Sequence, residues 1–456
     1  MLRTLDPHTR NPYIIDPACG EGAFLAYALE HKITSPERIY GVEKDPEIAA
    51  ALKNLGQVNL LIDDSLASIT LPAIAGSRRM RDNAQRSTLN APEGGYDWVV
   101  GNPPFGTKNL TGNELDNDFT IWQGRESLHY PIEILFLERF WQLAKPDGYV
   151  AIIVPDGILA NARLSYVREW LSQRAAIKAI ISLPQHTFHR TGAAAKASIL
   201  VFRRIANSGQ AYMAALKSNE PVLMRALEPD MWEVHLLNDG ARWDPAYYHP
   251  KYIENLHILE SLPNVVRFGE LIEYTTYGQV GAREYTQSGV RLLTPANLIT
   301  TSDGYVTGID IHSPERFVAP GSRNDPPRSR LQKGDLLLAN SGVGCIGRAA
   351  VFKKSDEPCN ISQHINLVRV KGIEPEYLAV YLQTRFAQLQ IHREKCGVGP
   401  CGINFDRIKS ILVPILPEDL RQEVVKGYAR LPAYPDSVRR LVKELEHSIA
   451  EGRKCV

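Results

Sequence analysis

The stretch Asp97-Trp98-Val99-Val100-Gly101-Asn102-Pro103-Pro104-Phe105 decides how the first half of the chain is interpreted. It predicts a strand of apolar residues that runs into an abrupt, rigid loop. Asn102 has a side-chain carbonyl acceptor, and Pro103 has a backbone carbonyl, no N–H and a fixed φ. Two acceptors are therefore held close together on stiff backbone, and Phe105 adds a flat apolar ring beside them.

This loop suits one chemical problem, which is to make a conjugated exocyclic amine attack an electrophile. The lone pair of such an amine is delocalised into its ring. It becomes available when acceptors hold both N–H bonds and the nitrogen pyramidalises. The ring of Phe105 can stack on the base that carries the amine. The plainer alternative is a turn after a strand, because Asn-Pro-Pro also has that use.

Length and composition indicate a globular chain of two or three domains. The 456 residues are 44% hydrophobic and 23% charged, and their net charge is +1, so contact with nucleic acid must come from local basic patches. No membrane span or signal-peptide pattern is visible, so we expect a cytoplasmic protein without a membrane partner. The six cysteines lack metal-ligand spacing, which predicts reduced thiols and no metal site.

A glycine turn follows the first predicted strand, Tyr13-Ile14-Ile15. It reads Asp16-Pro17-Ala18-Cys19-Gly20-Glu21-Gly22-Ala23-Phe24, and a helix continues from it through Leu29. A strand, a turn of small residues and a helix are the layout of a nucleotide-binding α/β unit. Gly20 and Gly22 let the backbone approach a ligand closely. The alternative is a tight turn with no ligand.

The next two predicted strands end in carboxylates. The strand at 39–42 ends at Glu43, roughly 20 residues beyond the glycines, where doubly wound folds place an acid on ribose hydroxyls. Asp45-Pro46 predicts a helix N-cap followed by proline at the first helical position. The strand at 59–62 ends at Asp63-Asp64. The alternatives are a solvated loop acid at Glu43 and a capping role for either aspartate.

Together, the glycine turn and the Asn-Pro-Pro-Phe loop resemble the γ-class N6-adenine DNA methyltransferases of restriction–modification systems. In that family the S-adenosylmethionine loop precedes the catalytic motif, as it does here. The resemblance implies catalytic roles for Asn102, Pro103, Pro104 and Phe105. It implies a cofactor site made of Asp16, Ala18, Gly20, Gly22, Glu43, Asp64 and Asn102. Asp64 matches the family's acceptor for the cofactor adenine better than Asp63 does.

Later segments extend the resemblance. Residues 183–192 and 197–202 look like the last hairpin of the methyltransferase sheet in type I modification subunits, which implies that Phe188 is a second aromatic contact for an extruded base. His186 and His189 lie in the same segment without an obvious partner. Arginines at 78, 79, 81 and 86 form a polar insertion, and residues 106–127 predict a mobile loop.

The second half of the chain changes character and shows short, evenly punctuated strands. Segments at 291–298, 331–342 and 346–348 resemble the target recognition domain of type I specificity subunits and fused type IIG enzymes. The alternative is an unrelated mixed α/β accessory domain. The expected fold class is therefore α/β, a doubly wound Rossmann-like methyltransferase sheet followed by a mixed α/β recognition domain. We assign 1–205 to the methyltransferase domain, 206–241 to a connector, and 242–456 to the recognition domain with its C-terminal helix.

The resemblance implies an adenine-N6 methyltransferase that acts on duplex DNA with S-adenosylmethionine. The chain departs from the family at its start, where only twelve residues precede Tyr13. We therefore expect that a separate chain supplies the missing front segment, that the frame begins upstream, or that cofactor binding is impaired. No nuclease motif is visible, which predicts modification without cleavage and a nuclease on another subunit. Two rival functions remain, a protein glutamine N5-methyltransferase and a non-catalytic DNA-binding subunit.

Overall fold

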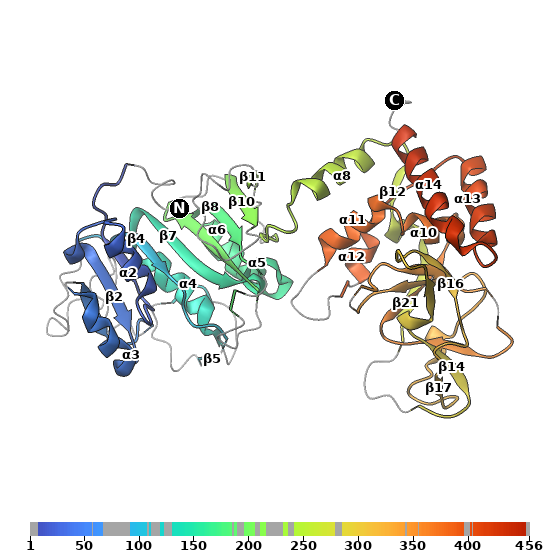
Figure 1. The fold of residues 1–456 in the computed structure, drawn as a ribbon, viewed down its shortest axis with the longest axis horizontal. Helices are drawn as coiled ribbons and strands as arrows, with labels where there is room; N and C mark the ends of the chain where they lie inside the picture. The colour runs from blue at the N-terminus through green and yellow to red at the C-terminus, as the bar shows by residue number, and fades with distance from the viewer. Residues whose placement is uncertain are drawn as a thin grey trace. The chain divides into compact units, whose positions relative to one another are not determined.

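The computed structural model divides the chain into two compact units, Met1–Tyr248 and His249–Val456 (Figure 1). The described residues are 8–56, 58–66, 92–106, 109–110, 119–122, 130–184, 187–188, 196–205, 210–215, 231–235, 241–278, 285–342, 344–353, 355–395, 402–403 and 405–452.

The N-terminal unit is built on one large sheet, which comprises nine strands within the described residues. Their spatial order is β11-β10-β8-β9-β7-β4-β1-β2-β3. The strands are β1 (Ile14–Asp16), β2 (Ile39–Glu43), β3 (Asn59–Ile62), β4 (Tyr96–Gly101), β7 (Ala144–Pro155), β8 (Ala176–Ser182), β9 (Ala197–Arg203), β10 (Gln210–Ala215) and β11 (Met231–His235). A separate small ladder joins β5 (Asn109–Leu110) and β6 (Tyr130–Pro131).

The strand order reverses direction at β1. β1 pairs in parallel with β2 on one side and with β4 on the other, and β4 pairs in parallel with β7. This is a doubly wound sheet with a switch point between β1 and β4, and ligands bind outside the carboxyl ends of the strands at such a point. The predicted doubly wound α/β fold is thus confirmed.

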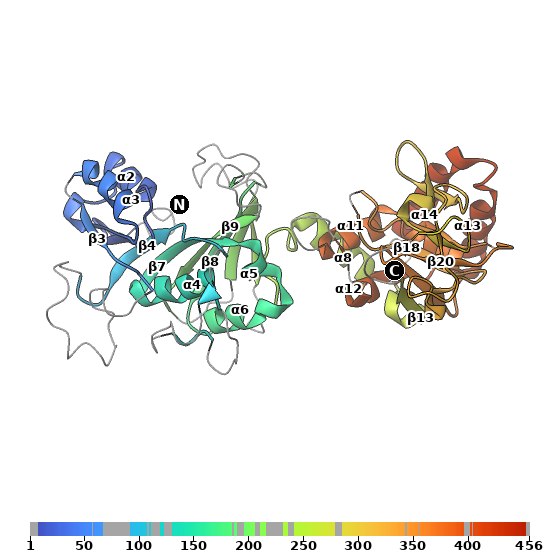
Figure 2. The same cartoon turned by 90° about the horizontal axis from the view of Figure 1, so that it is seen from below.

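Helices cover both faces of this sheet, as Figure 2 shows for α2 and α3 on one face and α4 and α6 on the other. Alternate residues of the strands face opposite sides. Ile14 and Trp98 belong to one hydrophobic core, whereas Ile15 and Val99 belong to the other. The helices are α2 (Ala23–Glu30), α3 (Pro46–Ala51), α4 (Ile132–Leu143), α5 (Asp156–Ala160) and α6 (Ser165–Ser172).

The hairpin that the sequence predicts at 183–202 lies beyond β7 in the sheet, and its second strand is β9. β9 lies between β7 and β8 and is antiparallel to both. Beyond it, β10 is parallel to β8, and β11 is antiparallel to β10. The last two strands fall in the stretch assigned from sequence to a connector, where the hydrophobic pattern is too short to predict strands.

Residues 145–148 lie inside β7, where the pairing with β4 is irregular. Tyr96 pairs with Ala144, and the next paired residue, Trp98, lies opposite Tyr149. Asp147 takes the left-handed φ of 64° that this excursion requires.

The C-terminal unit combines several small sheets with helices, as expected for a mixed α/β domain. A four-stranded sheet has the order β13-β21-β18-β19, and a three-stranded sheet has the order β17-β14-β20, within the described residues. Its strands are β12 (Val265–Arg267), β13 (Ile272–Tyr277), β14 (Val290–Leu293), β15 (Leu298–Thr300), β16 (Val306–Ile309), β17 (Phe317–Val318), β18 (Leu336–Ala339), β19 (Ala349–Val351), β20 (Cys359–Ile361), β21 (Ile365–Val370) and β22 (Leu412–Pro414).

Helix α10 is the centre of this unit's core. Its Tyr377 is fully buried and donates its hydroxyl to the Pro414 carbonyl of β22 at 2.6 Å, so the polar tip of a buried ring is satisfied. The helices are α8 (Pro250–Glu260), α9 (Phe268–Leu271), α10 (Pro375–Tyr381), α11 (Arg385–Glu394), α12 (Phe405–Lys409), α13 (Glu418–Arg430) and α14 (Val438–Gly452).

Candidate functional site

Two loops meet at the switch point of the N-terminal unit. β1 and β4 are adjacent and parallel, with Ile14 opposite Trp98 and Ile15 opposite Val99. Parallel strands end at the same edge of a sheet, so the glycine turn after β1 and the Asn-Pro-Pro-Phe loop after β4 leave the sheet side by side. The two motifs that the sequence singles out, about 85 residues apart in the chain, therefore lie at one edge.

Asp16 joins the two loops. Its side chain is 1% exposed, and its Oδ1 accepts the Ala18 N–H at 3.1 Å. A Cβ atom at Gly101 would lie 2.5 Å from this Oδ1, so only glycine allows the carboxylate to sit against the end of β4. Burial raises the pKa of Asp16 to about 7; the Ala18 N–H opposes this shift, and the Glu43 charge adds to it.

The glycine turn uses left-handed backbone at two positions. Gly20 has φ 50° and Gly22 has φ 79°, which is the region that favours glycine. A Cβ at Gly22 would approach the Leu52 side chain to 2.6 Å, whereas the space around Gly20 is open to 4 Å. The Leu52 side chain therefore packs against the turn at Gly22, whereas the open space at Gly20 leaves room for a ligand.

Glu43 holds the glycine turn from the end of β2. One carboxylate oxygen accepts the Gly20 N–H at 2.9 Å, and the other accepts the Asp45 N–H at 2.8 Å. Asp45 itself accepts from the N–H groups of Glu47 and Ile48 and has Pro46 next to it, which confirms the predicted helix N-cap. Glu43 thus holds the turn, and each of its oxygens keeps a second lone pair at the place where the sequence predicts a ribose ligand.

Asp64 follows β3 at the same edge. Its Oδ1 accepts the Leu66 N–H at 3.0 Å, and its Oδ2 lies 2.5 Å from the Lys44 ammonium. The Lys44 side chain is 74% exposed, and ion pairs at such exposure contribute little and exchange readily. Asp64 therefore has the capping role, and a ligand could take the place of Lys44 at Oδ2.

The Asn-Pro-Pro-Phe loop presents its residues alternately. Asn102 and Pro104 are exposed, Pro103 is buried and Phe105 is half-buried. The Phe105 ring contacts the Phe188 ring edge to face, with centroids 6.0 Å apart and an interplanar angle of 81°. The structure thus brings together the two aromatic residues predicted to flank a base, which are 83 positions apart.

Two acidic residues near this edge were not predicted from the sequence. Glu133, in the first turn of α4, accepts the Gly106 N–H at 2.9 Å. Asp156, directly after β7, accepts from the Ser198 hydroxyl at 2.7 Å and lies 3.4 Å from the Lys196 ammonium. Burial raises the pKa of Asp156, and the Lys196 charge opposes this. The position of Asp156 after a strand was a usable signal, whereas Glu133 had none.

Several sequence expectations concern residues outside the described part of the chain. These are His186 and His189, the arginines at 78, 79, 81 and 86, and most of the loop predicted at 106–127. Among the described residues, no three His, Cys, Asp or Glu side chains are grouped as a metal site requires. No helix in that same part is long and apolar enough to cross a membrane.

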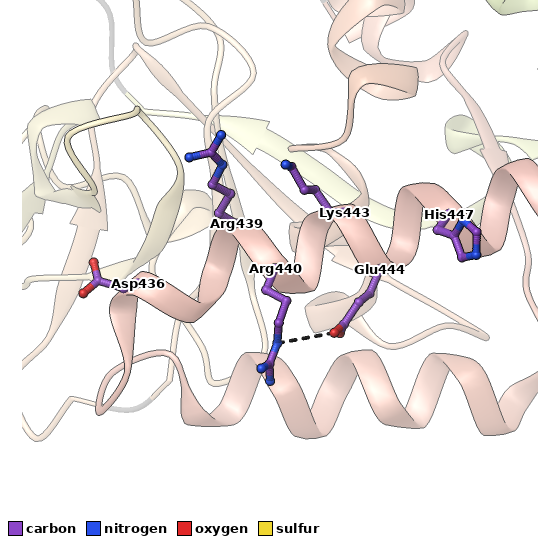
Figure 3. A pocket seen from close by; sticks show the side chains of 6 residues that line it. All are labelled: Asp436, Arg439, Arg440, Lys443, Glu444 and His447. Carbon is purple, nitrogen blue, oxygen red and sulfur yellow. Dashed lines mark ion pairs between the residues drawn. The ribbon is translucent and has the colours of Figure 1, made fainter.

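A shallow hollow in the C-terminal unit is made of surface charges. Figure 3 shows its side chains along α14 and, at Asp436, just before that helix begins; the Arg440 guanidinium lies 3.3 Å from the Glu444 carboxylate. The side chains of this pair are 80% and 62% exposed, so the pair contributes little to stability. None of the predicted site residues lines this hollow; its lining is Asp436, Arg439, Arg440, Lys443, Glu444 and His447.

Comparison with known proteins identifies both units. Residues 1–226 match the family described as N-6 DNA Methylase, and residues 318–428 match the Type I restriction modification DNA specificity domain. The EcoEI type I methylase subunit of Escherichia coli is 29% identical over 217 residues, 45% of this chain and 40% of that protein. The EcoBI specificity subunit of E. coli is 27% identical over 117 residues, 25% of this chain and 24% of that protein.

The solved structure of the type IIG restriction endonuclease BpuSI aligns with a TM-score of 0.45 and 14% identity, covering 98% of this chain and 63% of that one. This chain spans less than half the length of the two E. coli relatives. The family matches confirm the resemblances inferred from the sequence. Residues 1–226 thus form an N-6 DNA methylase domain, and a type I restriction modification DNA specificity domain follows at residues 318–428.

Proposed function

We propose that this chain is a site-specific DNA methyltransferase that transfers a methyl group from S-adenosylmethionine to adenine N6 in duplex DNA. It serves a restriction–modification or phage-defence system, and its C-terminal unit recognises the target site. The observation that carries this proposal is the contact between the glycine turn and the Asn-Pro-Pro-Phe loop through Asp16 and Gly101. This contact supports a cofactor site beside the two acceptors of the Asn-Pro-Pro-Phe loop.

The residues around the glycine turn fit S-adenosylmethionine. Open space at Gly20 admits a ligand close to the backbone. Glu43 and Asp64 follow neighbouring parallel strands and offer carboxylate oxygens for the ribose hydroxyls and the adenine amine. When bound there, S-adenosylmethionine supplies an electrophilic methyl group.

The neighbouring loop prepares the nucleophile. The Asn102 side-chain oxygen and the Pro103 carbonyl accept the two amine hydrogens of the target base, which frees the nitrogen lone pair. Phe105 and Phe188, whose rings touch edge to face, form an aromatic pair against which the extruded base packs. Their contacts offset part of the few kcal/mol that extrusion costs in lost stacking and pairing.

Positioning supplies most of this catalysis, so a strong general base is not required. The surplus proton of the methylated amine leaves to solvent, since Asn102 is exposed. Asn102 and Pro103 can hold the amine of adenine or of cytosine, and the match to the N-6 DNA methylase family favours adenine. The specificity-domain match at 318–428 favours DNA over a protein glutamine as the substrate.

The test uses wild-type chain and the N102A variant, each expressed in a host without DNA methylation. We expect N6-methyladenine at one recurrent sequence in the DNA of the wild-type host and none with N102A. Purified N102A should bind S-adenosylmethionine within about twofold of wild type by calorimetry, because the glycine turn is unchanged. The exposed Asn264, changed to alanine, serves as the matched control.

Three outcomes would contradict the proposal. Full transfer by N102A would remove Asn102 from the chemistry. Label from S-adenosylmethionine that enters protein and not DNA would favour the glutamine methyltransferase. A wild-type chain that has no measurable affinity for S-adenosylmethionine would instead favour a non-catalytic DNA-binding subunit.

A further inference from the structure

Helix α4 supports the Asn-Pro-Pro-Phe loop at both of its ends. At the start of the loop, the Phe140 ring lies 3.0 Å from the place of a Cβ at Gly101. At the end of the loop, Glu133 accepts the Gly106 N–H at 2.9 Å. Glu133 and Phe140 are seven residues apart, so they lie two helical turns apart on the same side of α4, separated by roughly 10 Å along the axis.

α4 is a rigid base for this purpose. Leu135, Leu137 and Phe140 are completely buried in the core. Its Glu138 is buried too and accepts from the N–H groups of Thr120 and Ile121 at 2.8 to 2.9 Å. A helix packed in this way moves little, so an anchor on it fixes the position of what it holds.

The loop has few backbone N–H groups with which to fix its own conformation. Pro103 and Pro104 have no N–H to donate, so the loop depends on contacts at its ends. Gly106 turns the chain with a left-handed φ of 50°, and space is open around it. Its N–H is directed to the Glu133 carboxylate by this turn. A charged acceptor forms a stronger hydrogen bond than a neutral one.

We propose that Glu133 is a positioning residue for methyl transfer. By holding Gly106 it sets where the Pro103 carbonyl and the Asn102 oxygen lie, and it keeps Phe105 against Phe188. This inference rests on the proposed function. Glu133 acts through the loop and touches neither base nor cofactor.

The test compares three variants, with chromosomal DNA from a methylation-free host as the methyl acceptor. E133A removes the acceptor, whereas E133Q keeps a side-chain oxygen that can accept the Gly106 N–H. The control is E418A, because Glu418 also lies in the first turn of a helix and is exposed. The measured quantities are kcat, KM for DNA and the affinity for S-adenosylmethionine.

We expect E133A to lower kcat about tenfold, since small misplacement of reacting groups is costly. KM for DNA and cofactor affinity should stay within about twofold. E133Q should recover kcat to within about threefold of wild type, and E418A should match wild type. Equal kcat for E133A and wild type would overturn the inference, as would an E133Q variant as impaired as E133A.

A second measurement does not depend on activity. Amide hydrogen exchange of the peptide containing Gly106 should be faster in E133A than in wild type and close to wild type in E133Q. Unchanged exchange in E133A would show that Glu133 does not order the loop and would overturn the inference. A wild-type chain that transfers no methyl group would overturn the proposed function, and with it the positioning role of Glu133 in methyl transfer, even with normal exchange at Gly106.

Discussion

The buried carboxyl group of Asp16 should make the N-terminal unit less stable as pH rises. The side chain is 1% exposed and its pKa is raised from 3.8 to about 7, chiefly by burial. Between pH 4 and pH 7 the unfolded chain loses this proton while the folded unit retains it. The folded state therefore binds more protons in this window, so its stability falls as pH rises and levels off above about pH 7.

The size of the effect follows from the pKa difference. A shift of about three units at 1.36 kcal/mol each amounts to roughly 4 kcal/mol. The D16N variant removes the ionisation but keeps an oxygen that can accept the Ala18 N–H. The free energy of unfolding of D16N minus that of wild type should therefore rise by roughly 4 kcal/mol from pH 4 to pH 8.

Tryptophan fluorescence makes the measurement specific for this unit. All six tryptophans lie in the N-terminal unit, at positions 98, 122, 141, 170, 232 and 243. Urea titrations of the full chain at several pH values give the free energy of unfolding of that unit. D147N, with an exposed carboxylate in the same unit, controls for the loss of one negative charge.

Parallel stability curves for D16N and wild type across this range would refute the reasoning. They would mean that the Asp16 carboxyl ionises in the folded unit as easily as in the unfolded chain. A difference that decreases with rising pH would be equally incompatible with a carboxylate that burial penalises.

Two further substitutions have outcomes that follow from buried contacts, a steric one at Gly101 and an ion pair at Asp335. In G101A the new methyl group meets Asp16 Oδ1 at 2.5 Å and the Phe140 ring at 3.0 Å, so we expect about 1–3 kcal/mol of destabilisation by tryptophan-monitored unfolding and lost methyl transfer; wild-type stability would contradict this. In D335A the Arg369 guanidinium loses its 2.8 Å partner, itself 2% exposed, which should lower the stability of the C-terminal unit by about 3 kcal/mol. Circular dichroism should show that loss while the tryptophan-monitored transition stays unchanged.

Local patterns in the sequence were enough to predict the elements that place the site. Three such patterns are the apolar run before Asn102, the apolar residues before Asp16, and the glycines at 20 and 22. Each determines backbone conformation only within a few residues of its own position. Asp45-Pro46 likewise predicted a cap that the structure shows. Hydrophobic period, proline geometry and glycine φ are properties of neighbouring residues, so the sequence alone reveals them.

The doubly wound order could also be expected, because successive β–α units leave few ways to arrange a parallel sheet. The pairing of β10 and β11 at the far edge could not. Their short segments carry no strong periodicity, and an edge strand depends on whichever neighbour offers free backbone groups.

Long-range contacts were decided only by the tertiary structure. The Asp16 carboxylate against Gly101, Glu133 on the Gly106 N–H, and Phe105 against Phe188 join positions 27 to 85 residues apart. No pattern in the intervening residues encodes these pairs, because they depend on how helix α4 and the sheet edge pack in space. From sequence the acceptors, the rings and Asp16 could be named, but the contact of Asp16 with Gly101 and the anchoring of Gly106 by Glu133 appear only in the fold.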